Sequence, residues 1–331
     1  MKSPAFWYPS DGRISWQARA LSPFSVLYAG TTRARLRKSP RFHSPVPIVC
    51  VGNINAGGTG KTPTVIALIE ELTRLGHRVA VVSRGYGGKV RGPVLVRAGL
   101  HSSEDVGDEP LLMSAFTSVW VARDRARGCE EAVRSGADVV VLDDGFQDPS
   151  VPKSLALVVV DASVAFGNGR VIPAGPLREP VSAGLDRASA LISIGEPEDR
   201  KRFSKAWAGS IPVPLLEAEL EPLQTGLPWH GLRVVAFAGI GRPEKFFRTL
   251  VSLGADIVRT VPLGDHQPLS PALLNRLALE ARARNAQLVT TEKDAVRLPP
   301  SFRNKVVTLP VRLRFSEPER LRQMLQELWA G

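Results

Sequence analysis

Short runs of consecutive apolar residues alternate along the chain with segments in which apolar residues recur at helical spacing. The runs at 46–51, 78–83 and 137–142 lack the polar alternation of a half-exposed strand, so they predict strands buried on both faces of a parallel sheet. The segments at 65–72 and 125–134, which lie between these runs, carry apolar residues about three or four positions apart. Strands that alternate with helices in this way predict an α/β fold built on a parallel sheet.

The second half of the chain continues the alternation without repeating the sequence of the first half. After one more buried strand predicted at 155–161, a second alternation begins. Its strands are predicted at 190–194, 232–238, 257–261, 287–290 and 306–309, and its helices at 198–207, 244–253, 271–284 and 317–329. This half therefore predicts a second, smaller α/β/α domain. With 331 residues the chain is long enough for two domains.

A glycine-rich turn joins the first predicted strand to the first predicted helix. Strand, glycine-rich turn, Gly-Lys-Thr and helix follow one another in the order of a phosphate-binding P-loop. Glycines let successive backbone N–H groups surround a phosphate, and the helix N-terminus adds partial positive charge. Lys61 is predicted to reach the β- and γ-phosphates of ATP, and the hydroxyl of Thr62 to bind Mg²⁺. The residues predicted to bind the nucleotide are Asn55, Ala56, Gly57, Gly58, Thr59, Gly60, Lys61 and Thr62.

The first position of this loop departs from the P-loop pattern. The pattern begins with a glycine five residues before Gly60, where this chain has Asn55. Asparagine tolerates left-handed backbone geometry better than most residues do. We therefore expect the loop to keep its P-loop form.

Two adjacent carboxylates, Asp143 and Asp144, follow the apolar run at 137–142. P-loop enzymes place at this point the carboxylate that holds Mg²⁺, directly or through water. Two acids at one strand end repel each other unless a cation compensates their charge. We therefore expect Asp143 and Asp144, together with Thr62, to form a metal site, and an Asp-Gly turn without function is the alternative.

A segment rich in glycine and proline, residues 166–180, follows the strand predicted at 155–161. We interpret it as a functional loop near the crevice between the domains, although its composition fits a simple linker nearly as well. Arg178 is the candidate to offset charge on the phosphoryl group during transfer, and Glu179 is the candidate to orient Arg178.

The positive charge of the chain is concentrated at its N-terminal end. The net charge is +11, and residues 1–44 hold eight basic residues and one acidic residue. Such a concentration predicts contact with a polyanionic surface, either nucleic acid or anionic lipid. A nucleic-acid binder would carry basic residues among aromatic ones on a sheet face or a recognition helix. The excess lies instead in one terminal segment, which favours lipid.

The same segment predicts an amphipathic helix over 15–29. On this helix Trp16, Phe24 and Leu27 share one face, although Pro23 is expected to interrupt it. An apolar face followed by basic residues is typical of a helix that lies in a membrane interface. A helix packed on the protein's own core is the alternative. No apolar run is long enough to span a membrane, and no signal peptide is expected.

These interpretations divide the chain into four parts. Residues 1–44 form a basic and aromatic segment that faces a membrane, and residues 45–150 a P-loop nucleotide-binding domain. Residues 151–180 form the connection that carries the site loop. Residues 181–331 form the second α/β domain, which contributes to the active-site cleft.

Several strings of residues resemble, in order, the tetraacyldisaccharide 4'-kinases of lipid A biosynthesis. The strings in the first half are the P-loop at 51–63, Ser-Arg-Gly-Tyr-Gly at 83–87, Gly-Asp-Glu-Pro at 107–110 and Asp-Asp-Gly-Phe-Gln at 143–147. Those in the second half are Phe-Gly-Asn-Gly-Arg at 166–170, Pro-Ala-Gly-Pro-Leu-Arg-Glu-Pro at 173–180, Ala-Gly-Ile-Gly-Arg-Pro at 238–243, Asp-His at 265–266 and Thr-Glu-Lys-Asp-Ala-Val at 291–296. Many families share the P-loop, whereas the Asp-Asp-Gly-Phe-Gln and Gly-Pro-Leu-Arg-Glu-Pro strings are specific.

The resemblance implies transfer of the γ-phosphate of ATP, with Mg²⁺, to the 4' hydroxyl of a tetraacyldisaccharide 1-phosphate, giving the 1,4'-bisphosphorylated lipid A precursor. It implies that Asp108 and His266 act together to activate that hydroxyl. Lys61 and Arg178 complete the predicted catalytic set. Substrate contacts are predicted for Arg84, Tyr86, Arg125 and Glu179. The implied location is the cytoplasmic face of the inner membrane of a Gram-negative bacterium, with peripheral association, no nucleic acid and no obligate protein partner.

Two positions depart from the strings of this family. Asp148 replaces the histidine that usually follows Asp-Asp-Gly-Phe-Gln, and Gln267 follows Asp-His in place of an aromatic residue. Asp148 adds negative charge near the predicted metal site. The alternative function is a P-loop ATPase switch of the partitioning or metal-chaperone type. Such proteins carry a second lysine before the Gly-Gly pair, where this chain has Ala56.

Overall fold

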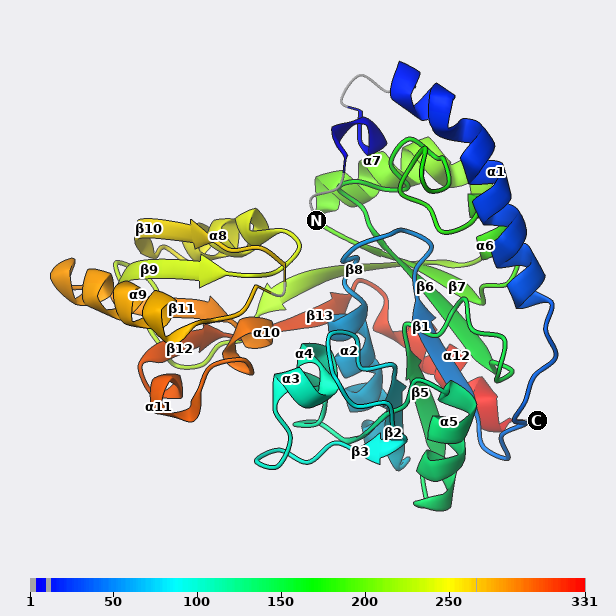
Figure 1. The fold of residues 1–331 in the computed structure, drawn as a ribbon, viewed down its shortest axis with the longest axis horizontal. Coiled ribbons are helices and arrows are strands. Elements are labelled where there is room, and N and C mark those ends of the chain that lie inside the picture. The colour runs from blue at the N-terminus through cyan, green and yellow to red at the C-terminus, as the bar shows by residue number, and fades with distance from the viewer. Residues whose placement is uncertain (1–3, 10–12, 266, 331) are drawn as a thin grey trace.

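The computed structural model describes residues 4–9, 13–265 and 267–330, which form two sheets covered by helices on both faces (Figure 1). The larger sheet has the strand order β13 (Val311–Phe315), β8 (Leu215–Pro222), β7 (Ala190–Ile194), β6 (Leu155–Asp161), β1 (Ile48–Gly52), β5 (Val139–Asp143), β2 (Val79–Ser83), β4 (Ser118–Val121), β3 (Val94–Leu95). The smaller sheet has the order β10 (Asp256–Pro262), β9 (Arg233–Ala238), β11 (Gln287–Thr291), β12 (Val306–Leu309).

The helices divide between the two sheets. Those of the larger domain are α1 (Trp16–Leu36), α2 (Lys61–Arg74), α3 (Ser103–Val106), α4 (Asp108–Met113), α5 (Arg125–Arg134), α6 (Val181–Leu185), α7 (Pro197–Trp207) and α12 (Pro318–Gln326). Those of the smaller domain are α8 (Pro243–Ser252), α9 (Pro271–Ala283), α10 (Glu292–Ala295) and α11 (Pro300–Arg303). The short 3-10 helices among the described residues are η1 (Ala5–Trp7), η2 (Ala208–Ser210) and η3 (Glu327–Trp329).

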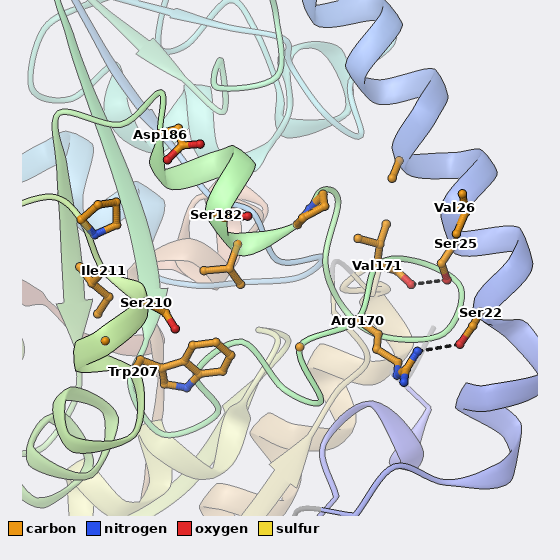
Figure 2. A pocket seen from close by; sticks show the side chains of 16 residues that line it. Ser22, Ser25, Val26, Arg170, Val171, Ser182, Asp186, Trp207, Ser210 and Ile211 are labelled. Carbon is orange, nitrogen blue, oxygen red and sulfur yellow. Dashed lines mark hydrogen bonds between the residues drawn. The ribbon is translucent and has the colours of Figure 1, made fainter.

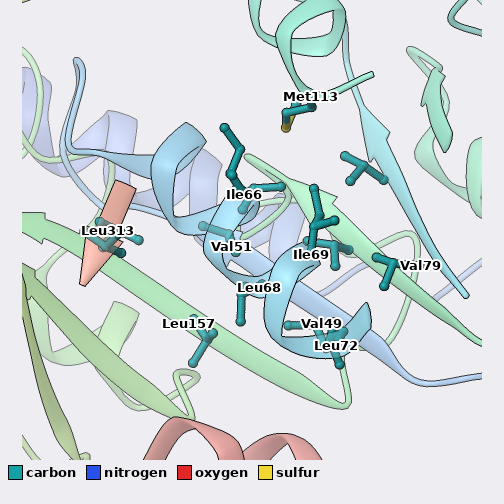
Figure 3. Packing of buried hydrophobic residues seen from close by; sticks show 14 of the residues in the cluster. Val49, Val51, Ile66, Leu68, Ile69, Leu72, Val79, Met113, Leu157 and Leu313 are labelled. Atoms are coloured by element: carbon teal, nitrogen blue, oxygen red, sulfur yellow. The ribbon is translucent and has the colours of Figure 1, made fainter. Parts of the chain in front are cut away.

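Alternate residues of the central strands point to opposite faces of the larger sheet. Val49 and Val51 of β1 share a core with α2, α4 and α12, whereas Ile48 and Cys50 share one with α5, α6 and α7. Figure 3 shows the first of these cores, in which Leu313 of β13 belongs to the same cluster as Val51. Burial on both faces explains why the central strands are continuous apolar runs in the sequence.

The smaller sheet is likewise covered on both faces. Its central strand β9 directs Val235 and Phe237 toward α9 and α11, and Val234 and Ala236 toward α8. The predicted α/β class with a second, smaller α/β/α unit is therefore confirmed.

The division between the two sheets differs from the division expected from the sequence. Strands β7 and β8 fall within the range 181–331 expected to form the second domain, yet they belong to the larger sheet, and β13 returns to its edge beside β8. The smaller sheet is therefore built from residues 233–309 alone. The physical reason is that β7 continues the parallel pairing of β6, so the segment 166–180 is a crossover within one sheet and not a link between two domains.

The antiparallel pair β8 and β13 was not predicted from the sequence. β8 carries acids at alternate positions, Glu217, Glu219 and Glu221, and β13 carries Arg312 and Arg314. In the register of the pair, Arg312 lies opposite Glu221 and Arg314 opposite Glu219. This alternation of apolar and charged residues is typical of half-exposed antiparallel strands.

The N-terminal helix is longer than expected. α1 continues through Pro23 to Leu36, and its N-cap residue Ser15 accepts a hydrogen bond from the N–H of Ala18 at 3.2 Å. Proline cannot donate to the carbonyl four residues earlier, that of Arg19. Because Pro23 and Arg19 are both exposed, water can satisfy this carbonyl, and the helix is not interrupted.

The burial pattern of α1 is the reverse of that of a core helix, because its small side chains are buried and its large apolar side chains are exposed. Its buried residues are Ala18, Ser25 and Thr32. The large apolar side chains of Trp16, Phe24 and Leu27 are 74%, 59% and 68% exposed. Small side chains thus pack on the protein while an apolar patch faces outward, which is typical of an interaction surface. Within the part of the chain that the structure describes, no helix is long and apolar enough to cross a membrane.

Candidate active site

The P-loop lies at the carboxyl end of β1, near the middle of the larger sheet. Gly57 and Gly60 have φ angles of 115° and 96°, a backbone region that favours glycine. Gly60 is the N-cap of α2, and a Cβ atom there would lie 2.7 Å from Cδ1 of Ile194. Lys61 and Thr62 are the first two residues of α2, so their backbone N–H groups lie in the first turn, where a phosphate is favoured.

Asparagine side chains fix the loop from within. Nδ2 of Asn53 donates to the hydroxyl of Thr59 at 3.1 Å, and Nδ2 of Asn55 donates to the carbonyl of Ala165 at 3.0 Å. Asn55 does not adopt the left-handed geometry considered from the sequence. It pairs instead with Leu177 in an isolated antiparallel bridge, so extended backbone explains why glycine is not needed there.

The segment 166–180 runs directly along the P-loop. The N–H of Ala56 donates to the carbonyl of Pro176 at 2.7 Å, and the N–H of Arg178 donates to the carbonyl of Ile54 at 2.7 Å. These bonds on either side of the bridge bring Arg178 to the nucleotide site. The interpretation of this segment as a site loop agrees with these contacts.

The two acids at the end of β5 have different partners. Asp144 has a φ angle of 50°, and its Oδ1 lies 3.5 Å from Nζ of Lys61 and 3.3 Å from Nη1 of Arg178. Asp143 accepts a hydrogen bond from the hydroxyl of Ser83 at 2.8 Å. Among the described residues, none reaches its second oxygen, Oδ1, with a hydrogen bond. Asp144 is thus neutralised by cations, while one buried oxygen of Asp143 is unsatisfied.

The pKa values of these carboxyl groups are shifted in opposite directions. Burial raises the pKa of Asp143 to about 7, and the neighbouring charges of Glu109 and Asp144 add to the rise. Burial also acts to raise the pKa of Asp144, but Lys61 and Arg178 outweigh it and hold this pKa below its usual value. A cation placed beside Asp143 would favour its ionised form.

The acids fit a magnesium site of the P-loop type. In the residues that the structure describes, no group of three or more His, Cys, Asp or Glu side chains is arranged to hold a metal ion by itself. Magnesium at a P-loop takes its ligands from phosphates, water, a hydroxyl and one or two carboxylates. The unsatisfied Oδ1 of Asp143 is an oxygen of that kind. The residues present therefore fit Mg²⁺ bound together with a nucleotide.

Arg178 is oriented by Gln147 and Asp144. Its Nη1 donates to Oε1 of Gln147 at 3.2 Å and to Oδ1 of Asp144 at 3.3 Å. Glu179 is buried and accepts hydrogen bonds from Nε2 of Gln147, at 3.0 Å, and from Arg187. Glu179 therefore contacts Arg178 through Gln147, and its predicted role in orienting Arg178 stays a prediction.

Arg125, predicted to contact substrate, lies buried behind Asp144. Its Nη2 donates to the backbone carbonyl of Asp144 at 2.7 Å, and its Nη1 lies 3.2 Å from Oδ2 of Asp148. Burial acts to raise the pKa of Asp148, but hydrogen bonds from Ser150 and the charge of Arg125 hold it below its usual value. Arg125 thus supports the left-handed turn at Asp144 and compensates the extra negative charge of Asp148.

Asp108 lies where the smaller domain reaches the larger one. Its Oδ2 lies 3.4 Å from Nε of Arg297, and Oε1 of Glu109 lies 3.1 Å from Nζ of Lys293. Both cations come from the segment that begins with α10. Arg297 also donates to the backbone carbonyl of Gln267 at 2.7 Å. Acids on α4 and cations of the smaller domain thus meet at one edge of the site.

His266, the predicted partner of Asp108, lies outside the described residues, so that pair stays a prediction. The residue before it, Asp265, has its Oδ1 4.0 Å from Nζ of Lys293. Burial acts to lower the pKa of Lys293, but Glu109 and Asp265 outweigh it and raise this pKa. Glu109 and Asp265 therefore favour the charged form of Lys293, which lies next to both of them.

Arg84 and Tyr86 follow β2 in a loop that packs against α4. Both side chains are exposed. The backbone carbonyl of Tyr86 lies 2.6 Å from where a Cβ atom of Gly107 would be, and the φ angle of Gly107 is 91°. Only glycine fits this close approach, which brings the loop next to Asp108. The predicted contacts of Arg84 and Tyr86 with substrate stay predictions.

A cavity of about 780 Å³ lies between α1 and α6 (Figure 2). Its walls come from α1, α6, the end of α7 and the loop around Arg170. Arg170 donates to the hydroxyl of Ser22 at 2.8 Å, and the hydroxyl of Ser25 donates to the carbonyl of Val171 at 2.7 Å. α6 begins shortly after Arg178, so the site loop connects the cavity with the P-loop.

The family model of LpxK, the tetraacyldisaccharide-1-phosphate 4'-kinases, matches residues 17–330. The chain belongs to this family. A tetraacyldisaccharide 4'-kinase from Dinoroseobacter shibae is 53% identical over 330 residues, which cover 99% of this chain and 98% of the relative. One from Jannaschia sp. is 54% identical over 317 residues, covering 96% of each protein.

A solved 4'-kinase has the same fold. The crystal structure of LpxK from Aquifex aeolicus in complex with ATP matches with a TM-score of 0.76 at 26% sequence identity, and the match covers 94% of this chain and 99% of that one. The resemblance to the 4'-kinases stated from separate strings of residues is thus confirmed over nearly the whole chain.

Several residues of the candidate site were not predicted from the sequence. They are Ser83, Glu109, Gln147, Arg187, Lys293 and Arg297. Ser83, Glu109, Gln147 and Lys293 lie inside the strings that carry the family resemblance, so these strings held a signal for them. Arg187 and Arg297 lie outside those strings, and only the fold brings them to the site.

Proposed function

We propose that the protein transfers the γ-phosphate of ATP to the 4' hydroxyl of a tetraacyldisaccharide 1-phosphate. The observation that carries the proposal is the arrangement of Lys61 and Arg178 at 3.5 and 3.3 Å from Asp144 beside the P-loop. This arrangement occurs in a chain that is 53% identical to a tetraacyldisaccharide 4'-kinase over 330 residues. Two cations there offset the negative charge of the phosphoryl oxygens during transfer.

Mg²⁺ is the cofactor proposed alongside ATP, with Thr62, Asp143 and Asp144 as the residues that would hold it. When bound, the metal supplies charge neutralisation at the β- and γ-phosphates. With a nucleotide bound, Lys61 and Arg178 would exchange their contact with Asp144 for phosphate oxygens, and Asp144 would then be available as an oxygen ligand. The support for this assignment is the unsatisfied Oδ1 of Asp143 and the oxygen chemistry that magnesium prefers.

Asp108 is the proposed general base, with His266 as its partner. The carboxylate accepts the proton of the 4' hydroxyl as the oxygen bonds to the γ-phosphorus. The bond from the γ-phosphorus to the bridging oxygen then breaks, and ADP leaves. Arg297, 3.4 Å from Oδ2 of Asp108, holds the carboxylate in place.

The proposed acceptor is a lipid, and the proposed location is the cytoplasmic face of the inner membrane of a Gram-negative bacterium, with peripheral association. The exposed apolar side of α1, carrying Trp16, Phe24 and Leu27, supports contact with a bilayer. Basic residues that attract anionic lipid follow along the chain, namely Arg33, Arg35, Arg37, Lys38 and Arg41. The cavity beside α1 offers an apolar wall next to the site loop.

The test is transfer of labelled γ-phosphate to a tetraacyldisaccharide 1-phosphate in detergent micelles, with and without Mg²⁺. We expect labelling of the glycolipid that requires the metal. Lys61→Met should lower it at least about 100-fold, because the phosphates lose their P-loop cation. Lys89→Met, which removes an exposed lysine paired with Glu104 at 2.9 Å, is the matched control. Labelling that is equal in both variants would contradict the proposal.

A further inference from the structure

The two domains meet at a second place, away from Asp108. Asp161 ends β6, the strand next to β1. Its Oδ2 lies 2.8 Å from Nζ of Lys245 and 3.2 Å from Nη1 of Arg242. Arg242 also donates to the hydroxyl of Ser163 at 2.6 Å. Lys245 lies on α8 and Arg242 is the N-cap residue of this helix, so these four residues, here named the latch, join the smaller domain to the larger one.

The latch is sheltered from water. The side chain of Asp161 is 8% exposed, and those of Arg242 and Lys245 are each 33% exposed. Burial acts to raise the pKa of Asp161, but Lys245 and Arg242 outweigh it and hold the pKa below its usual value. A carboxylate this buried is strongly unfavourable without its partners, so the smaller domain is held in the position that supplies them.

The latch lies one strand away from the P-loop. Ile194 of β7 is the register partner of Asp161, and its Cδ1 packs against Gly60 at the start of α2. In the larger sheet, β6, which carries Asp161, lies on one side of β1. The helix α4 contacts β4, which lies on the other side of β1. At both places an acid of the larger domain pairs with cations of the smaller domain, which fixes the smaller domain at two points across the nucleotide site.

We propose that the latch is a positioning device for the transfer reaction. It sets the angle at which the smaller domain brings Arg297 and Lys293 to Asp108 and Glu109. The covalent connections between the two sheets are residues 223–232, between β8 and β9, and Pro310, between β12 and β13. Side-chain contacts between the domains act together with these connections to set the angle. The effect on turnover rests on the proposed function, whereas the effect on the angle does not.

Kinetics separates positioning from nucleotide binding. In Lys245→Met we expect kcat to fall about tenfold, since small misplacements of reacting groups have effects of this size or larger. The KM for ATP should change less than about twofold, because the P-loop belongs to the larger domain. Lys245→Arg keeps the charge and should restore kcat. Asp256→Asn, which removes an exposed ion pair with Arg233 inside the smaller domain, is the matched control.

A distance measurement between the domains tests the angle without using activity. Spin labels on Leu100→Cys of the larger domain and Leu279→Cys of the smaller domain occupy exposed positions. The native thiols of Cys50 and Cys129 are buried, which raises the pKa of each to about 12, so they react poorly with the label.

We expect the distance distribution to be narrow in the parent protein and broadened in Lys245→Met and Asp161→Asn. It should stay narrow in Lys245→Arg and Asp256→Asn. Distributions in Lys245→Met and Asp161→Asn as narrow as in the parent protein would overturn the latch. Because this readout needs no phosphate transfer, it decides the proposal even where the kinase assay gives no product.

Discussion

Asp143 and Asp144 are neighbours in the chain, yet they face different surroundings. The left-handed backbone at Asp144 turns its carboxylate toward Lys61 and Arg178, whereas Asp143 stays in the strand and keeps one oxygen unsatisfied. The strand end thus favours the charged form of Asp144 and the neutral form of Asp143, and a bound metal ion would favour the charged form of both.

The stability of the metal-free protein should reflect this buried acid. An unfolded aspartate has a pKa near 3.8, and folding raises that of Asp143 to about 7. The folded state therefore binds an additional proton between these values, and stability falls as pH rises through that window. Relative to the parent protein, Asp143→Asn should gain about 2 kcal/mol in the free energy of unfolding between pH 5 and pH 8, while losing transfer activity.

Denaturant unfolding at the two pH values, without Mg²⁺, measures this gain. Asp138→Asn is the control, and its difference in stability from the parent protein should be the same at both pH values. Arg78 lowers the pKa of Asp138 to about 2, so its contribution is present above pH 3.8 and is lost as pH falls toward 2. An Asp143→Asn variant with the same difference in stability at both pH values would show that the carboxyl group is not perturbed.

The proposed base and its partner should act as one unit. Asp108→Asn and His266→Ala should each lower kcat about 100-fold, and the double variant should be little worse than either. Single-turnover kinetics on the four proteins of the cycle measures the coupling. Losses that multiply would argue for independent roles. His43→Ala, an exposed histidine before β1, is the control.

At the scale of elements, α1 packs through small side chains and exposes large ones. We expect Phe24→Glu with Leu27→Glu to weaken binding to anionic vesicles about tenfold or more, because two apolar side chains leave the interface and two negative charges enter it. Co-sedimentation measures the binding. Leu279→Glu on α9, where the parent leucine is 67% exposed, is the control. Unchanged co-sedimentation of the double variant would contradict the membrane role of α1.

The elements also show which parts of the fold a sequence can reveal. β1, β2 and β5 were predicted because burial on both faces makes their residues continuously apolar. β8 and β13 were missed, since each alternates apolar with charged residues and their pairing joins distant segments. The domain boundary was misplaced for the same reason, because these two strands extend the larger sheet beyond residue 181.

The site was predictable where chemistry is local. The P-loop spacing gave Lys61 and Thr62, and the strand end gave the paired acids. Arg187 and Lys245 could not be found in this way, because no local pattern relates them to the site. Arg125 was expected to contact the substrate, but its side chain is buried and donates to the carbonyl of Asp144. No residue spacing in the sequence predicts the turn at Asp144 that places this carbonyl there.

At the scale of the whole molecule, the larger domain is discontinuous. Its C-terminal part returns after the smaller domain, and Leu325 of α12 is fully buried in the core with Val51. Trp329 stacks on His77, with ring centroids 3.6 Å apart. The larger sheet therefore depends on residues at the far end of the chain.

Leu325→Ala should lower the free energy of unfolding by about 3 kcal/mol, since it removes a core side chain and leaves a cavity. Leu279→Ala, at an exposed position of α9, should change it by less than about 0.5 kcal/mol. Equilibrium denaturation measures both. Equal values for the two variants would show that α12 adds little to the core.

During synthesis, β8 leaves the ribosome before the entire smaller domain, and β13 follows that domain. At typical translation speeds the delay is roughly ten seconds, and the smaller domain, continuous in the chain, is free to fold in that time. Throughout the delay β8 is an open sheet edge, a hazard on a polysome where identical nascent chains are crowded together. Its acids, Glu217, Glu219 and Glu221, would repel their counterparts on neighbouring chains. In the folded protein β13 covers this edge, and its Arg314 lies 2.9 Å from Glu221.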